Sequence, residues 1–191
     1  MVHDIKDPIV IDKVFSDEDF SMLHSYLFNK DKTQHYFDTG FGRYSFQDDV
    51  VDLYHQKSLE LAREVFNSPT LLPSYALFAH YEGPNARLWR HKDDNACTYT
   101  IDLCVYQNQP WDLWIEDKPY TLHENQAATI YGNDQWHWRE AFPNPDSQYV
   151  ANIFFHYVEP DHWFFTKGAS YLDVVRGIIS EGEWNARHLS Q

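Results

Sequence analysis

Hydrophobic positions near the start of the chain recur at the spacing of an α-helix. A β-branched run at Ile9-Val10-Ile11 predicts a short first strand. Ser16-Asp17-Glu18-Asp19 then has the form of a capping box with Asp at its last position, so a helix is expected over 17–29. A second helix is expected from about Asp49 to Phe66, and 30–48 predict a loop with one strand. The apolar positions of the two helices are Phe20, Leu23, Leu27, Phe28, Val50, Leu53, Tyr54, Leu61, Ala62 and Val65.

The pattern changes at Ser74, where short runs of aromatic and β-branched residues begin. Each run is bounded by Pro, Gly, Asn or Asp, which is typical of a sandwich or barrel of many short strands. The sequence predicts one domain over 1–191, mainly β with flanking helices. It consists of N-terminal helices in about 1–70, a jelly-roll core in about 74–158 and a C-terminal helix at about 170–181. The expected strands lie at about 74–81, 97–106, 111–115, 127–131, 135–142 and 148–158.

Composition and charge limit the classes of partner. The chain has 191 residues and a formal net charge of −14, so its surface repels phosphate backbones and nucleic acid is not an expected partner. Arg87, Arg90 and Lys92 cluster locally, which favours a small anionic ligand. Two lone cysteines, Cys97 and Cys104, indicate a reducing compartment. Without a signal-like start or a long apolar run, we expect a cytoplasmic protein that does not interact with membranes.

The candidate chemistry begins at His91-Lys92-Asp93. On an extended segment, alternate side chains point the same way, so His91 and Asp93 can bind one ion together. About one His-x-Asp is expected by chance in a chain with 11 His and 19 Asp, so a third ligand must decide. His137 follows a Gly132-Asn133-Asp134 turn, and several jelly-roll strands fit between it and Asp93. Two histidines and one carboxylate leave adjacent positions open, as non-haem iron(II) oxygenases require.

These segments resemble the iron(II)- and 2-oxoglutarate-dependent oxygenases, in particular the prolyl-4-hydroxylase-like branch. That branch has a Tyr-x-Gly-type turn shortly before its His-x-Asp motif, as in Tyr81-Glu82-Gly83-Pro84-Asn85 and then Leu88-Trp89-Arg90-His91-Lys92-Asp93. Trp136-His137-Trp138-Arg139-Glu140 and Ile153-Phe154-Phe155-His156-Tyr157 are similar to the distal part of the family core. The resemblance covers most of the chain, and its specific motifs lie within residues 79–158.

The resemblance implies a double-stranded β-helix (jelly-roll/cupin-like) core and a dioxygenase that hydroxylates a C–H bond, with Fe(II), 2-oxoglutarate and O2. It implies His91, Asp93 and His137 as metal ligands, with Asp93 favouring hydroxylation over halogenation. Family members usually carry a cation on the last core strand for the distal carboxylate of 2-oxoglutarate, but 146–152 contain none. Arg139 is our candidate for that role, since it is expected to share the strand face of His137. Tyr81 and Tyr106 are expected to add hydrogen bonds.

The substrate and two other functional classes stay open at the level of sequence. An amino acid, a peptidyl residue or another small molecule would fit, and the oligomeric state is not predicted. The chain could instead be a cupin-like metal enzyme that does not use 2-oxoglutarate, or a non-catalytic jelly-roll binding module. The remaining candidate residues are read as structural or as core aromatics: His80, His123, His156, His162, Trp111, Trp114, Trp136, Trp138 and Trp163.

Overall fold

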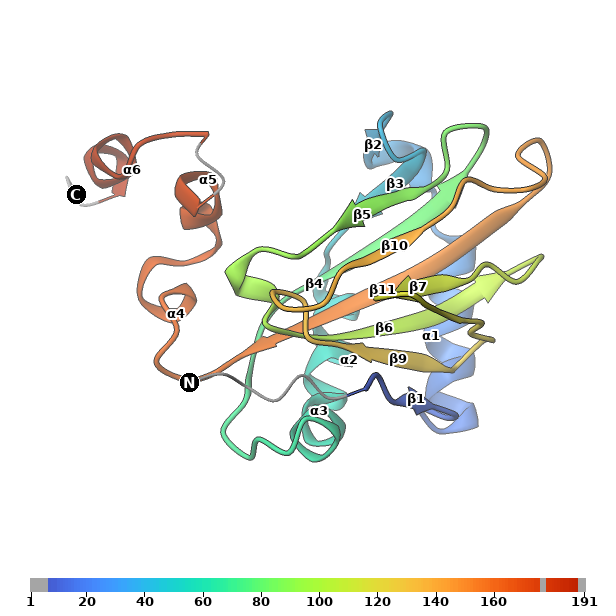
Figure 1. The fold of residues 1–191 in the computed structure, drawn as a ribbon, viewed down its shortest axis with the longest axis horizontal. Helices are drawn as coiled ribbons and strands as arrows, with labels where there is room; N and C mark the ends of the chain where they lie inside the picture. Colours follow the sequence, from blue (N-terminus) through green and yellow to red (C-terminus); the bar gives the residue numbers. More distant parts are fainter. Residues whose placement is uncertain (1–6, 176–177, 189–191) are drawn as a thin grey trace.

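Two antiparallel sheets face each other in the computed structural model, which describes residues 7–175 and 178–188 (Figure 1). This architecture confirms the predicted jelly-roll core with flanking helices. The seven-stranded sheet has the order β1 (Val10–Ile11), β9 (Ala127–Ile130), β6 (Tyr99–Gln107), β11 (Tyr149–Val158), β4 (Leu72–Glu82), β3 (Arg43–Phe46) and β2 (Tyr36–Asp38). The four-stranded sheet has the order β5 (Leu88–His91), β10 (His137–Arg139), β7 (Leu113–Ile115) and β8 (Lys118–Tyr120).

The long strands of the larger sheet are buried on both faces because helices cover one face and the smaller sheet covers the other. On β11, Ile153, Phe155 and Tyr157 belong to the main hydrophobic cluster with the helices. The alternate residues, among them Phe154 and His156, line the space between the sheets. Burying each large apolar side chain contributes roughly 1.5–3 kcal/mol, so the helix side holds the fold while the inner side can carry polar groups.

Helices α1 (Asp17–Asn29), α2 (Asp49–Lys57) and α3 (Leu59–Val65) lie on the outer face of the seven-stranded sheet (Figure 1). Helix α1 begins as expected, because the Ser16 hydroxyl accepts a hydrogen bond from the Asp19 amide at 3.1 Å. The single helix expected over 49–66 is instead broken at Ser58. The Ser58 hydroxyl donates to the carbonyls of Tyr54 and His55, each at 3.0 Å, and so competes with the helical ladder.

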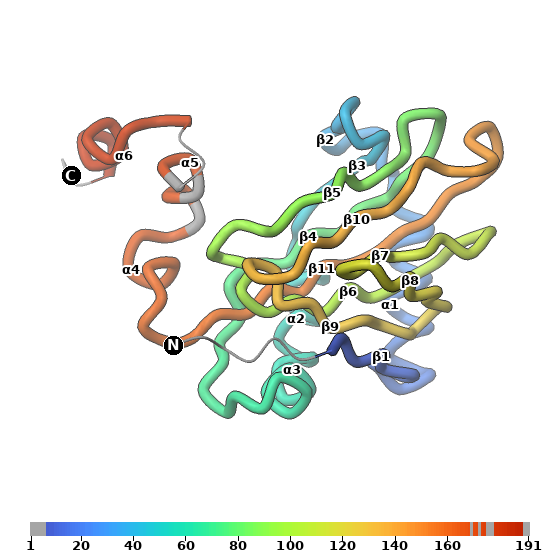
Figure 2. The backbone as a smooth tube through the Cα atoms, in the orientation of Figure 1, coloured from blue at the N-terminus to red at the C-terminus, as the bar shows by residue number. Residues whose placement is uncertain are grey.

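The described part of the C-terminal segment contains short helices in place of the one expected over 170–181, and 176–177 lie outside the described residues. The short helices are α4 (Phe164–Lys167) and α5 (Leu172–Val175), then α6 (Glu181–His188). Ser180 and Glu183 form a capping box, with the Glu183 amide 3.2 Å from the Ser180 hydroxyl and the Ser180 amide 2.8 Å from Glu183 Oε2. A helix therefore starts where the expected one ends. Figure 2 shows this segment lying apart from the sheets. Short 3-10 turns occur at Lys32–Gln34, Asn95–Cys97 and Ala169–Tyr171.

In the part of the chain that the structure describes, none of the helices combines the length and apolar character needed to cross a bilayer.

Candidate metal centre

Strand pairing brings the two candidate histidines together. His91 ends β5 and His137 begins β10, and the two residues are direct partners in this antiparallel pair. Their ring centroids lie 4.2 Å apart. Residues opposite each other across an antiparallel pair have neighbouring side chains on one face, so register alone fixes the two rings side by side.

Asp93 lies just beyond β5, in the turn that leads to the Asn95–Cys97 helix. Its amide donates to the Gly132 carbonyl at 2.8 Å, which holds the turn against the segment before β10. Asp93 Oδ1 lies 3.2 Å from His91 Nε2 and 3.4 Å from His137 Nε2. The three side chains therefore converge on one point, and their ligand atoms lie within 4.8 Å of one another.

Backbone carbonyls orient both rings. His91 Nδ1 lies 2.7 Å from the Trp89 carbonyl, and His137 Nδ1 lies 3.1 Å from the Gln135 carbonyl. Because a carbonyl only accepts, each Nδ1 carries a hydrogen, and Nε2 is the ring nitrogen that faces Asp93. Two imidazole nitrogens, each able to exchange its proton for a metal, and a carboxylate oxygen around one point are the donors that a divalent transition metal uses. The residues present therefore fit a metal ion.

The electrostatics of the protein without metal support the same conclusion. Burial raises the pKa of Asp93, but hydrogen bonds from His137 and His91 outweigh burial and hold this pKa far below its ordinary value. Burial lowers the pKa of His137, and the Asp93 carboxylate more than offsets this, so the net pKa of His137 is raised. The buried Asp93 carboxylate thus favours a positive charge beside it, and a protonated histidine or a metal cation can supply that charge.

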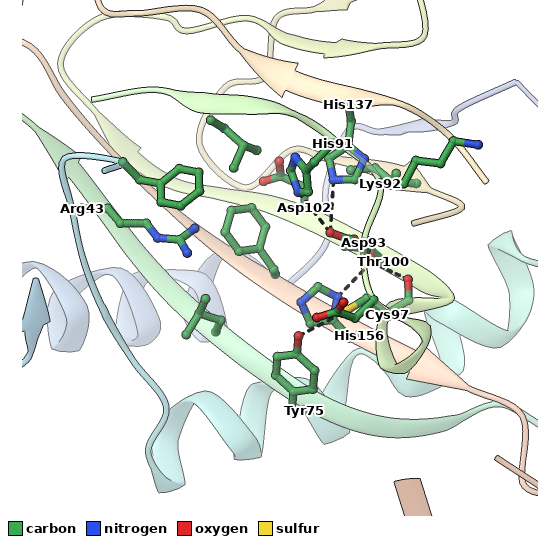
Figure 3. A pocket seen from close by; sticks show the side chains of 16 residues that line it. Arg43, Tyr75, His91, Lys92, Asp93, Cys97, Thr100, Asp102, His137 and His156 are labelled. Atoms are coloured by element: carbon green, nitrogen blue, oxygen red, sulfur yellow. Dashed lines mark hydrogen bonds and ion pairs between the residues drawn. The ribbon is translucent and has the colours of Figure 1, made fainter. Parts of the chain in front are cut away.

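A cavity of about 300 Å³ opens beside the three side chains (Figure 3). One part of its wall is polar and carries Tyr75, Cys97, Thr100 and His156. Burial lowers the pKa of His156 to about 4, so this ring is neutral near pH 7. The rest of the wall is formed by Phe41, Arg43, Leu77, Leu88, Lys92, Asp94, Asp102, Ile130 and Phe154.

A second donor set shares Asp93 with the first. Asp93, Cys97 and His156 also offer ligand atoms within 4.8 Å of one another. The two sets differ in chemistry, because a thiol favours softer ions such as zinc over the iron(II) of oxygenases. His156 Nδ1 also lies 2.9 Å from the Thr100 hydroxyl. The set with two histidines is therefore the better fit for iron.

Arg139 lies between the sheets and faces the interior, but it does not line the cavity. Its Nη2 donates to Asp102 Oδ2 at 2.8 Å, and its Nη1 donates to the Trp111 carbonyl at 2.7 Å. Both side chains of the ion pair are essentially inaccessible, at 1% and 0% exposure. The guanidinium is thus already neutralised by a carboxylate of this chain.

The two candidate tyrosines lie on opposite faces of the larger sheet. Tyr81 is buried between the sheets, where its hydroxyl accepts from Arg43 Nη1 at 3.3 Å. Tyr106 faces the helices, where its ring contacts Phe28 and its hydroxyl lies 3.0 Å from His80 Nδ1. A register shift in the β6–β11 pair at Ala151/Asn152 accompanies this placement. The structure therefore does not bring Tyr106 to the cavity.

Three polar residues of the cavity lining that sequence reasoning did not assign to the site are His156, Asp102 and Arg43. His156 and Asp102 occupy inward positions of β11 and β6, and strict alternation along those strands was the available signal. Arg43 comes from β3, in the segment that was read as a loop with one strand. Nothing in the spacing of that segment connects it with the His-x-Asp motif, because only the β3–β4 pairing places it beside the core.

Comparison with solved structures shows which fold this arrangement belongs to. A viral collagen prolyl hydroxylase from Paramecium bursaria Chlorella virus-1, in complex with 2-oxoglutarate, is similar with a TM-score of 0.59 and 12% identity. The match covers 83% of this chain and 99% of that one. HygX from Streptomyces hygroscopicus, with nickel, 2-oxoglutarate and hygromycin B bound, gives a TM-score of 0.64 and 12% identity. That match covers 83% and 85% of the two chains.

The chain has the fold of the 2-oxoglutarate-dependent oxygenases. EctD from S. alaskensis, with bound iron, adds a third match at a TM-score of 0.57 and 11% identity, covering 82% of this chain and 74% of that one. No family model and no curated protein matches the sequence.

Proposed function

We propose that the protein is an iron(II)- and 2-oxoglutarate-dependent dioxygenase that hydroxylates a C–H bond of an amino-acid, peptidyl or other small substrate. The observation that carries the proposal is the convergence of His91, Asp93 and His137 beside a cavity in this fold. Two histidines and one carboxylate leave open positions on iron for a co-substrate and oxygen. The structures of similar proteins contain 2-oxoglutarate, nickel or iron, which supports the same chemistry.

In this proposal His91, Asp93 and His137 hold the iron, which supplies the activation of oxygen and the oxidation of a C–H bond. The carbonyls of Trp89 and Gln135 keep the histidine Nε2 atoms directed at the metal. The neutral His156 ring and the Thr100 hydroxyl give the adjacent wall polar groups without a net charge. Phe154 and Leu77 exclude water from the other side.

The size of the cavity favours a small co-substrate with the primary substrate approaching from outside. A volume of about 300 Å³ is at the lower end of the range for ligand pockets, which runs to roughly 1,000 Å³. The His91 side chain is 35% exposed, so the metal position is open toward solvent on that side. A peptidyl or small-molecule substrate can therefore reach it from the side of His91.

A metal enzyme that does not use 2-oxoglutarate is the second candidate, and one observation favours it. Arg139, which was expected to bind the distal carboxylate, is committed to Asp102. A buried carboxylate without a partner is costly, so use of 2-oxoglutarate requires another cation in the cavity.

The test of the proposed function combines metal binding with turnover. Purified protein reconstituted with iron(II) is expected to bind one equivalent of metal and to convert 2-oxoglutarate to succinate in the presence of oxygen. His91→Ala and His137→Ala should lose both properties. His123→Ala, which changes an exposed histidine, serves as the matched control. Stoichiometric iron without any succinate, even with candidate substrates added, would favour the second candidate.

A further inference from the structure

We propose that Arg43 binds the distal carboxylate of 2-oxoglutarate, so that the co-substrate is anchored by the β2–β3 hairpin outside the core strands. This inference rests on the proposed function. It identifies the cation for the distal carboxylate, which the proposed function requires and Arg139 does not provide. The geometry on which it stands is the position of Arg43 in the wall of the cavity that also contains His91, Asp93 and His137 (Figure 3).

Arg43 reaches the cavity through strand pairing. It lies opposite Tyr81 in the β3–β4 pair, and its side chain lines the cavity between the sheets. Only 18% of the side chain is exposed. Its Nη1 donates to the Tyr81 hydroxyl at 3.3 Å, while its Nε is buried and has no hydrogen-bond partner. The guanidinium therefore retains donors for a ligand.

The charge of Arg43 is weakly compensated by the protein. The nearest carboxylate oxygen, Asp38 Oδ2, lies 4.0 Å from its Nη2, whereas Arg139 has an Asp102 oxygen at 2.8 Å. The other cation of the cavity wall, Lys92, is exposed, and its Nζ lies 5.5 Å from the Trp136 ring centroid. Among the described residues that line the cavity, Arg43 is thus the largely buried cation that lacks a close carboxylate partner.

The wall beside Arg43 has the polarity that 2-oxoglutarate needs. Arg43 and the three candidate ligands line the same cavity (Figure 3), and the apolar residues of its lining are Phe41, Leu77, Leu88, Ile130 and Phe154. 2-Oxoglutarate carries a keto acid at one end, two methylene groups and a carboxylate at the other. The keto acid fits the metal, the methylene groups fit the apolar wall, and the carboxylate fits the guanidinium.

Tyr81 holds the guanidinium in place. Its hydroxyl oxygen accepts from Arg43 Nη1, while Tyr81 itself is fully buried and does not line the cavity. The hydrogen bond that the resemblance implied from Tyr81 to the co-substrate is thus replaced by a hydrogen bond from Arg43 to Tyr81. Asp102 also lines the cavity, but its two oxygens are bound by Arg139 and Asn152.

The experiment compares two keto acids that differ only in the distal carboxylate. Binding of 2-oxoglutarate and of 2-oxovalerate to the manganese(II)-loaded protein is measured by calorimetry, without turnover. The wild type should prefer 2-oxoglutarate by about a hundredfold or more, because a buried guanidinium–carboxylate pair forms in one complex alone. Arg43→Leu should abolish this preference and leave the affinity for 2-oxovalerate and for manganese unchanged.

Three further variants test which groups produce the preference for 2-oxoglutarate. Arg43→Lys should restore part of the preference, because the charge returns without the forked geometry. Tyr81→Phe should reduce it by about tenfold, as expected for one lost hydrogen bond to a charged group. Lys92→Leu, which removes the outward cation of the same wall, should leave the preference intact. Thermal unfolding of each variant establishes that it is folded.

Two results would overturn the inference about Arg43. One is a wild type that binds both keto acids equally, and the other is an Arg43→Leu protein that keeps the wild-type preference. In both cases keto-acid binding, and with it the proposed function, survives. If the manganese-loaded wild type binds neither keto acid, the proposed function fails and the inference fails with it.

Discussion

Replacing Gly132 by alanine would displace the proposed ligand Asp93 without removing any side chain of the site. A Cβ added at Gly132 would lie 2.2 Å from the Cys97 carbonyl oxygen and 2.6 Å from Asp93 Oδ2. Ordinary contact begins near 3.4 Å, so the Cys97 oxygen must move by about 3.4 − 2.2 = 1.2 Å. The Cys97 oxygen belongs to the backbone and cannot rotate away, so the segments carrying Asp93 and Gly132 must separate.

The expected effect on metal binding follows from this displacement. Metal–ligand distances are held to within about 0.2 Å, and disturbing the groups that orient a ligand typically costs about 10–100-fold in affinity. We therefore expect Gly132→Ala to bind manganese(II) about 10–100 times more weakly than the wild type. Forcing a methyl group into a close-packed position should also lower the free energy of unfolding by about 1–3 kcal/mol.

Calorimetric titration of manganese(II) and denaturant unfolding measure these two quantities. Gly182→Ala is the matched control, because the nearest atom to its added Cβ, Ser180 Oγ, lies 3.9 Å away. The control should bind the metal like the wild type. Wild-type manganese affinity in Gly132→Ala would show that Asp93 is not positioned through this contact, and would refute the reasoning.

Three further predictions concern groups around the site. Burial lowers the pKa of His55 to about 3. Below pH about 6.5, His55 therefore binds a proton in the unfolded chain but stays neutral in the folded protein. The free energy of unfolding should fall by about 1.4 kcal/mol per pH unit from this group, and His55→Gln should flatten a denaturant series between pH 7 and 5. Arg139→Leu should cost about 3–5 kcal/mol because it leaves Asp102 buried and unpaired, and Arg139→Leu with Asp102→Leu should recover part of the loss in the same assay. An unrecovered double variant would show that the pair is not the cause. Cys97→Ser should keep wild-type iron stoichiometry, and loss of iron would instead favour the donor set with His156.

The sequence predicted those parts of the fold whose pattern is local. The helix over 17–29 and the long strands near 74–81, 97–106 and 148–158 follow from capping and alternation, and the structure contains them as α1, β4, β6 and β11. The convergence of His91, Asp93 and His137 was predicted from the motif together with the family resemblance. In the structure it depends on the β5–β10 register and the Gly132 contact.

The remainder depends on tertiary contacts that no local pattern encodes. At the break at Ser58, the buried hydroxyl contacts the Tyr157 hydroxyl of β11 at 2.7 Å as well as the carbonyls of Tyr54 and His55. Arg139 was expected to face a ligand from its strand position, but it forms an ion pair with Asp102, which lies on a strand distant in the sequence. Arg43 enters the cavity through the pairing of a four-residue strand with β4. Each outcome is set by a partner far away in the sequence.

The most direct measurement of the central claim is an anaerobic optical titration of 2-oxoglutarate into the iron(II)-loaded protein. A keto acid that chelates iron(II) through its carboxylate and keto oxygen produces a charge-transfer band in visible light. We expect a band that saturates at one equivalent in the wild type and is absent in His137→Ala. A wild-type protein with one bound iron and no band, or an unchanged band in His137→Ala, would contradict it.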